Sequence, residues 1–154
     1  MEIIDNTALR VCLPTDIVQT VTRYVDRSEV VDGNLLLCWD YDEAAYLAQT
    51  LDHKQPDPNI PGVPSPMLRD YKFPGIYKPF AHQVDTASFM SLRSRCFVFN
   101  EAGTGKTSAA VWAADYLMTI GKVKRVLVIC PMSIMYTAWQ ADVFSARPWL
   151  PGAG

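Results

Sequence analysis

Compact apolar runs alternate with helical periodicity in the first third of the chain. Residues 8–13 form one such run, and apolar side chains then recur at helical spacing over residues 17–25. Residues 35–39 form a second run, followed by another apolar helical face near residues 46–51. The pattern therefore predicts a small α+β accessory domain over residues 1–54.

Local signals and a weak internal repeat refine this prediction. Thr15 and Asp42 are placed where they could cap the two helices, and residues 32–34 (Asp-Gly-Asn) are typical of a turn. Shifted by 26 residues, the two halves are identical at four of nineteen positions, among them Leu9 with Leu35. We interpret this as a possible duplicated strand–helix unit.

A proline-rich segment follows, and the charge changes sign across it. Five prolines fall between Pro56 and Pro66, which predicts an extended linker over residues 55–70. Residues 1–70 hold 5 Lys/Arg against 12 Asp/Glu, a net charge of −7, whereas residues 71–154 hold 9 against 4, a net charge of +5. The near-neutral total therefore conceals an acidic part and a basic part.

The second part alternates apolar strands with helices. Gly121 is placed to end one of these helices. Continuous apolar strands between helices predict an α/β fold with a parallel sheet covered on both faces. The predicted helices are residues 83–92, 107–120 and 134–144, and the predicted strands are residues 96–100 and 126–130.

Residues 100–107 (Asn-Glu-Ala-Gly-Thr-Gly-Lys-Thr) lie between a predicted strand and a predicted helix. In such a loop, Gly103 and Gly105 let successive backbone N–H groups point toward a phosphate. Lys106 would contact the β- and γ-phosphates, and the Thr107 hydroxyl would hold Mg²⁺. The strict phosphate-loop pattern has glycine where this chain has Asn100. The loop nevertheless predicts nucleotide binding.

In combination, three motifs over residues 73–150 resemble the superfamily 2 helicases and translocases, in particular their Swi/Snf-like branch. Gln83, in a Pro-Phe-Ala-His-Gln sequence, resembles the adenine-reading Q motif, and residues 100–107 resemble motif I. The resemblance implies that residues 71–154 are the first part of a RecA-like helicase domain that binds ATP and Mg²⁺. The implied cofactor-binding residues are Gln83, Glu101, Ala102, Gly103, Thr104, Gly105, Lys106 and Thr107.

Residues 126–139 resemble motif Ia of the same branch, which contacts the nucleic-acid backbone. The resemblance implies that Pro131, Met132 and Ser133 contact DNA. For Ser133 a helix-capping role is an equal alternative, and for Trp139 we favour core packing. Residues 1–54 weakly resemble the HARP-type modules that bind DNA, although their acidity opposes contact with phosphate, and a plain interaction or packing module is an equal alternative.

The resemblance implies that the chain is the N-terminal portion of a DNA-dependent ATPase. In that family the acidic motif II and the arginine fingers lie downstream of motif Ia, so we expect no catalytic residue within this chain and negligible ATP turnover. Its partners would then be DNA, bound weakly if at all, and the remainder of the helicase or a partner chain. The alternatives are a short non-catalytic nucleotide-binding regulator, a split subunit acting with a helicase partner, and a different phosphate-loop enzyme completed by a partner chain.

The cysteines, the lengths of the apolar runs and the basic residues limit the possible compartments and ligands. The four cysteines lie in apolar runs without the spacing of zinc ligands, so we expect four buried thiols in a reducing compartment and no structural metal. No apolar run is long enough to span a bilayer and no export signal is visible, so we expect an intracellular, soluble protein of the cytoplasm or nucleoid, with the nucleus left open. Basic residues including Arg93, Arg95 and Lys122 predict either a solvated face or a weak nucleic-acid surface.

Overall fold

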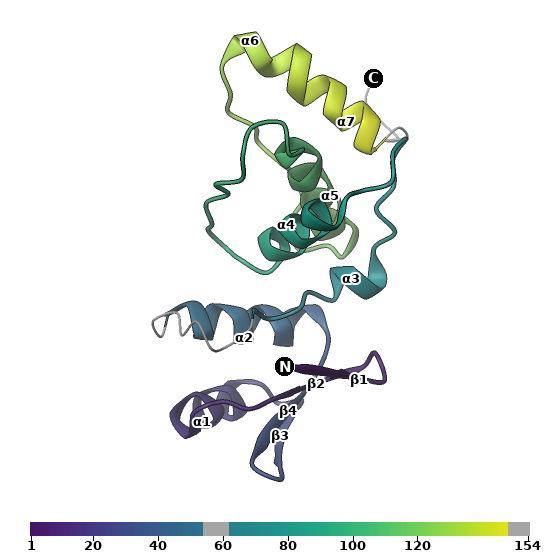
Figure 1. The fold of residues 1–154 in the computed structure, drawn as a ribbon. Helices are drawn as coiled ribbons and strands as arrows, with labels where there is room; N and C mark the ends of the chain where they lie inside the picture. The colour runs from purple at the N-terminus through teal and green to yellow at the C-terminus, as the bar shows by residue number, and fades with distance from the viewer. Residues whose placement is uncertain (54–61, 148–154) are drawn as a thin grey trace. The chain divides into compact units, whose positions relative to one another are not determined.

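The computed structural model describes residues 1–53 and 62–147, which fall into two compact units (Figure 1). Unit 1 comprises Met1–Arg69 and Leu92–Ser94, and unit 2 comprises Asp70–Ser91 and the chain from Arg95 onward. The protein has a mixed α/β fold. Within the described parts, every paired strand belongs to unit 1.

Unit 1 is built on a four-stranded antiparallel sheet with the strand order β1-β2-β4-β3. Asp32 and Gly33 form the two-residue turn between β3 and β4, and both have positive φ (50° and 77°), as a type I′ hairpin turn requires. The strands are β1 (Glu2–Ile4), β2 (Ala8–Val11), β3 (Ser28–Val31) and β4 (Asn34–Cys38).

Two helices, α1 (Thr15–Tyr24) and α2 (Tyr41–His53), pack on one face of this sheet. Alternate side chains of the two central strands point toward them, because successive residues of a strand face opposite sides. The largest fully buried side chain of the core is that of Trp39, directly after β4. Other buried core residues are Leu9, Val11, Leu35 and Leu37 from the sheet, and Ile17, Val21, Ala44, Leu47 and Ala48 from the helices.

The 26-residue offset seen in the sequence relates equivalent elements of unit 1. Each half consists of a hairpin followed by a helix, β1-β2-α1 and then β3-β4-α2. Core positions separated by the offset are buried in both halves, for example Leu9 with Leu35 and Val21 with Leu47. The repeating element is thus a strand–strand–helix unit, and the sequence pattern had missed its first strand, β1 or β3, in both halves.

Neither predicted helix cap of unit 1 is observed. Helix α1 begins at Thr15 itself, and the extended Pro14 precedes it with a carbonyl that accepts hydrogen bonds from the N–H groups of Ile17 and Val18. Asp42 is the second residue of α2, and the Asp40 carbonyl accepts the first bond of that helix from Ala44. Asp42 still stabilises the helix electrostatically, because its carboxylate in the first turn interacts favourably with the partial positive charge at the helix N-terminus.

The predicted linker is not extended throughout. Residues 54–61 lie outside the described residues, but α3 (Met67–Asp70) is a helical turn within the range predicted to be linker. Its start is explained by Ser65 and Pro66, because the Ser65 hydroxyl accepts a hydrogen bond from the Met67 N–H (3.2 Å) and proline is favoured at the first helical position. The Trp39 indole donates to the Pro64 carbonyl (2.8 Å), so this segment belongs to the core of unit 1.

Unit 2 is helical in its described residues. Helix α5 ends as predicted at Gly121, whose φ of +74° allows a Schellman motif in which Gly121 N–H bonds Met118 O and Lys122 N–H bonds Leu117 O. The helices are α4 (Ala81–Ser91), α5 (Lys106–Thr119), α6 (Met132–Ile134), the π-helical η1 (Met135–Gln140) and α7 (Ala141–Ala146).

The predicted strands of unit 2 do not form in the described residues. Residues 96–100 and 126–130 are neither helical nor paired, and no parallel sheet is present in the described parts of the chain. Four of their apolar side chains face solvent almost entirely, with 82% and 90% of Phe97 and Phe99, and 84% and 89% of Leu127 and Ile129, exposed. The expectation of buried strands is thus not met. A strand is stabilised by hydrogen bonds to a neighbouring backbone, and neither segment pairs with another strand among the described residues.

Candidate nucleotide-binding site

Two glycines in the loop before α5 adopt a left-handed backbone conformation. Gly103 and Gly105 have φ values of +79° and +74°, a left-handed region that side chains with a Cβ rarely adopt. Gly105 is the residue that precedes α5, so Lys106 is the first residue of the helix and Thr107 the second. The glycine spacing therefore turns the chain sharply into the helix N-terminus.

The side chain of Lys106 folds back over this loop. Its Nζ donates hydrogen bonds to the carbonyl oxygens of Asn100 (2.9 Å) and Glu101 (2.7 Å). The Thr104 hydroxyl donates to the Glu101 carbonyl as well (2.8 Å), which tightens the turn. The loop thus curls around the ammonium group, and the lysine charge lies at the helix N-terminus.

Backbone donors are concentrated at the same place. Within the described residues, the N–H groups from residue 102 to residue 107 donate no hydrogen bond. The first N–H groups of a helix have no partner inside the helix, and the macrodipole gives that end a partial positive charge. Together with Lys106 and the half-buried Thr107, these groups form a donor set that suits an anionic phosphate and its metal ion.

Gln83 lies directly against the loop. Its Oε1 accepts a hydrogen bond from the Phe80 N–H at the start of α4 (3.0 Å), and its Nε2 donates to the Thr104 carbonyl (3.3 Å). A Cβ added to Gly105 would collide with the Gln83 amide. Gln83 therefore connects the start of α4 to the loop through both ends of its side chain.

Two further contacts to the loop were not predicted from the sequence. His82 hydrogen-bonds the Thr104 carbonyl through Nε2 (3.0 Å), which requires a proton on that nitrogen. Asn100, which replaces the first glycine of the strict pattern, donates to the Thr86 hydroxyl on α4 (2.9 Å). The local sequence does not indicate these contacts, because the two partners are 22 residues apart in the first contact and 14 residues apart in the second.

The residues predicted to contact DNA lie elsewhere in unit 2. Pro131, Met132 and Ser133 are exposed at the start of α6, and no hydrogen bond joins them to the loop in the described residues. Ser133 does not cap the helix, since Pro131 occupies the capping position. The half-buried Trp139 lines an apolar pocket instead.

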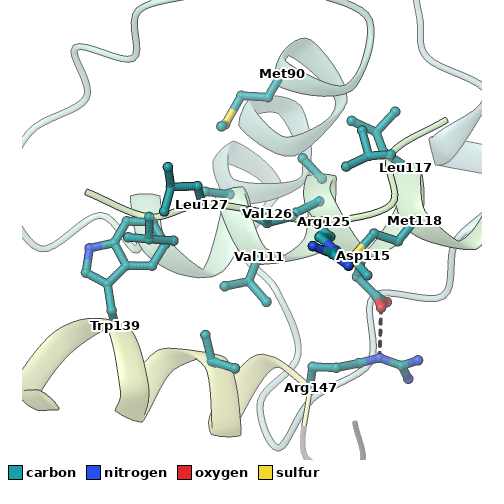
Figure 2. A pocket seen from close by; sticks show the side chains of 16 residues that line it. Met90, Val111, Asp115, Leu117, Met118, Arg125, Val126, Leu127, Trp139 and Arg147 are labelled. Atoms are coloured by element: carbon teal, nitrogen blue, oxygen red, sulfur yellow. Dashed lines mark hydrogen bonds and ion pairs between the residues drawn. The ribbon is translucent and has the colours of Figure 1, made fainter. Parts of the chain in front are cut away.

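That pocket has a volume of about 570 Å³ and lies between α5, residues 123–128 and the C-terminal helical stretch (Figure 2). Figure 2 shows Val126 and Leu127 crossing it and Trp139 at one side. At its rim, Arg147 Nε donates to Asp115 Oδ1 (3.0 Å). The second carboxylate oxygen of Asp115 accepts from Tyr71 (2.6 Å), and burial together with this hydrogen bond raises the pKa of the tyrosine hydroxyl.

An indole hydrogen bond joins the segment before α4 to α5 and α7. Trp112 Nε1 on α5 donates to the Pro74 carbonyl (2.8 Å) and approaches the Ala146 carbonyl (3.3 Å). Gly75 has a φ of +153°, and a Cβ there would lie 2.9 Å from the backbone oxygen of Ser145. The chain that leads into the Gln83 motif is thereby fixed against α7, which the sequence pattern did not reveal.

Two further predictions are corrected or limited by the structure. Cys12 and Cys96 are exposed and Cys38 and Cys130 are only partly buried, contrary to the expectation of four buried thiols. Arg93, counted among the basic residues of a possible nucleic-acid face, belongs to unit 1 and pairs with Asp52 (3.0 Å). Cys38 is a poor nucleophile, because burial and its hydrogen bond to Asp40 raise the pKa of the thiol.

The described residues contain no group of three His, Cys, Asp or Glu side chains that could hold a metal ion. None of the helices in residues 1–53 and 62–147 is both long and apolar enough to cross a membrane. Comparisons with known protein families, with curated proteins and with solved structures found no match.

Proposed function

We propose that unit 2 binds ATP with Mg²⁺ through residues 100–107. The observation that carries the proposal is the left-handed Gly103 and Gly105 immediately before α5, with the Lys106 ammonium held over the loop they form. The unpaired backbone donors and the ammonium suit the β- and γ-phosphates, and Thr107 supplies a hydroxyl for the metal. Mg²⁺ would polarise the phosphates and neutralise their charge.

Residues at the start of α4 are the proposed contacts to the base. Phe80 is largely exposed and its ring stacks on His82 (centroids 5.7 Å apart, planes 8° apart), which offers a flat aromatic face to a purine. Gln83 can donate to and accept from an adenine edge, although this requires it to release one of its two present hydrogen bonds. We therefore expect the loop and α4 to adjust when nucleotide binds.

We further propose that the chain is part of a superfamily 2 DNA-dependent ATPase. In that case residues 96–100 and 126–130 are strands of a RecA-like parallel sheet, and other strands pair with them in the intact assembly. The almost fully exposed side chains of Phe97, Phe99, Leu127 and Ile129 support this, as does the apolar pocket lined by residues 126–128. DNA and the remainder of the helicase are the partners under this proposal.

The test is equilibrium binding of a fluorescent, non-hydrolysable ATP analogue with and without Mg²⁺. Lys106→Ala should weaken binding by at least about tenfold, since it removes a charged contact to phosphate. Lys124→Ala, a charge-matched control on the exposed segment after α5, should stay within about twofold of wild type. Equal affinities of the two variants, or affinity that is unaffected by Mg²⁺, would refute the proposal.

A further inference from the structure

Two side chains of α4 hold a single carbonyl group of the loop before α5. The Thr104 carbonyl oxygen accepts one hydrogen bond from His82 Nε2 (3.0 Å) and a second from Gln83 Nε2 (3.3 Å). A carbonyl oxygen has two acceptor positions, so the two donors do not exclude each other. Both donors belong to the first three residues of α4, and Thr104 lies between the two left-handed glycines. The start of α4 therefore holds the loop where its backbone turns most sharply.

These hydrogen bonds also fix the direction of a neighbouring backbone donor. The peptide bond between Thr104 and Gly105 is trans, so its C=O and N–H groups point in opposite directions. Because the Thr104 carbonyl is held toward α4, the Gly105 N–H is directed away from that helix. Glycine places little steric restraint on rotation of this peptide, so its orientation depends on the hydrogen bonds. The Gly105 N–H is one of the backbone donors that the proposed nucleotide site offers to a phosphate.

Gln83 has a second contact, which it is expected to keep when a nucleotide binds. Its Oε1 accepts a hydrogen bond from the N–H of Phe80, the residue before α4 (3.0 Å), as the third helical residue does in a capping box. Its bond to Thr104 is the longer of the two and exceeds the usual N–H···O distance. The bond from Gln83 to Thr104 is therefore the one that a contact with the base replaces.

We propose that His82 is a positioning residue of the nucleotide site, which holds the Thr104 carbonyl when Gln83 leaves it to contact the base. This inference rests on the proposed binding of nucleotide by unit 2. The bond from His82 is the shorter of the two, and its ring is stacked on Phe80, which restricts rotation of the imidazole. The two donors are redundant without nucleotide, and His82 alone remains once the base is bound.

A comparison of one ligand that has a base with one that has none tests this exchange. Calorimetry measures the affinity of the full chain, with Mg²⁺ present, for a non-hydrolysable ATP analogue and for inorganic triphosphate. Triphosphate leaves Gln83 on Thr104, so His82→Phe, which keeps an aromatic ring beside Phe80 but loses the donor, should stay within about twofold of wild type. The ATP analogue requires Gln83 to leave, so the same variant should weaken its binding about fivefold, as expected for one hydrogen bond.

Three further variants separate positioning from a purely structural role. His82→Gln restores an N–H donor and should return affinity for the ATP analogue to within about twofold of wild type. In a Gln83→Ala background no second donor remains, so His82→Phe should weaken triphosphate binding about fivefold as well. The matched control is His53→Phe, which removes the other histidine of the chain from an exposed position at the end of α2 and should leave both affinities within about twofold. Circular dichroism checks that all variants are folded.

Several outcomes overturn the proposal. Equal weakening of both ligands by His82→Phe would show that the histidine acts independently of Gln83, and failure of His82→Gln to restore affinity would show that the N–H donor is not what matters. Triphosphate binding that ignores His82→Phe in the Gln83→Ala background would show that the Thr104 carbonyl needs neither donor. If neither ligand binds the wild-type chain, the proposed nucleotide site itself fails and this inference falls with it. That result differs from wild-type binding with the wrong pattern among the variants, so the two failures are distinguishable.

Discussion

Substitution of Gly105 by alanine tests the close contact between the phosphate-loop candidate and α4. Two features require glycine there: a left-handed φ of +74° and the approach of the Gln83 amide to the position a Cβ would occupy. Gly121 has the same φ and Gly103 a φ of +79°, but neither has any atom within 4 Å of an added Cβ. Alanine at these two positions therefore introduces the backbone strain alone.

The expected losses follow from these contacts. A left-handed conformation costs a residue with a Cβ about 1–2 kcal/mol, which is the whole loss expected for Gly103→Ala and Gly121→Ala. At Gly105 the methyl group also displaces the Gln83 amide, which loses its bonds to Phe80 N–H (3.0 Å) and to the Thr104 carbonyl (3.3 Å). At about 0.5–1.5 kcal/mol for each bond, the loss for Gly105→Ala rises to about 2–5 kcal/mol.

Hydrogen exchange of peptides that cover the start of α5 measures this difference directly. The protection there should fall most in Gly105→Ala, and affinity for the ATP analogue should fall with it, since 2 kcal/mol corresponds to about 30-fold. In a Gln83→Ala background the collision is absent, so Gly105→Ala should cost only the strain seen at Gly121. Equal losses at Gly103, Gly105 and Gly121 would refute the Gln83 contact.

Two further predictions concern unit 1. Arg69→Ala should lower its free energy of unfolding by about 2 kcal/mol, because the guanidinium donates to the carbonyls of Asn6 (2.7 Å) and Trp39 (3.0 Å) and lies over the Trp39 ring. Arg69→Lys should recover about half in urea denaturation, and full recovery would show that the forked geometry is unimportant. Burial alone would raise the pKa of Asp40, but hydrogen bonds, the first from Arg27, outweigh it and hold the pKa below 3.8. This stabilisation is complete above the ordinary pKa and is lost as pH falls through the lower folded value, so Asp40→Asn should flatten the stability profile below about pH 4; an unchanged slope would contradict this.

The pattern of apolar residues predicted the elements of unit 1 that are buried. Strands β2 and β4 and helices α1 and α2 each present a regular apolar face to one core. The edge strands β1 and β3 were missed because they are short and mostly exposed, so they show no alternation between buried and exposed positions. Each of these strands precedes a turn with positive φ, at Asp5–Asn6 and at Asp32–Gly33.

In the candidate site, the sequence predicted what is local and missed what is distant. The loop glycines, the start of α5 near Lys106 and its end at Gly121 follow from neighbouring residues, and all are observed. The contacts of Gln83 and Asn100 with other segments depend on tertiary structure, which no short motif encodes. An apolar run such as residues 126–130 shows what a segment is suited to bury and does not say which strand it pairs with.

The uneven distribution of charge along the chain bears on where anionic ligands can bind. Residues 1–70 carry a net charge of −7, whereas residues 71–154 carry a net charge of +5 and include the phosphate-loop candidate. Under the proposed function, the anionic nucleotide and DNA are attracted to residues 71–154, and DNA binding by a HARP-like module in residues 1–54 stays a prediction that the acidity of that part opposes. Salt weakens complexes with nucleotide and with DNA alike, so salt dependence alone does not separate them. Variants that lose carboxylates from residues 1–70 do separate them, because they should reduce the repulsion of DNA by that part and leave nucleotide binding by residues 100–107 unchanged.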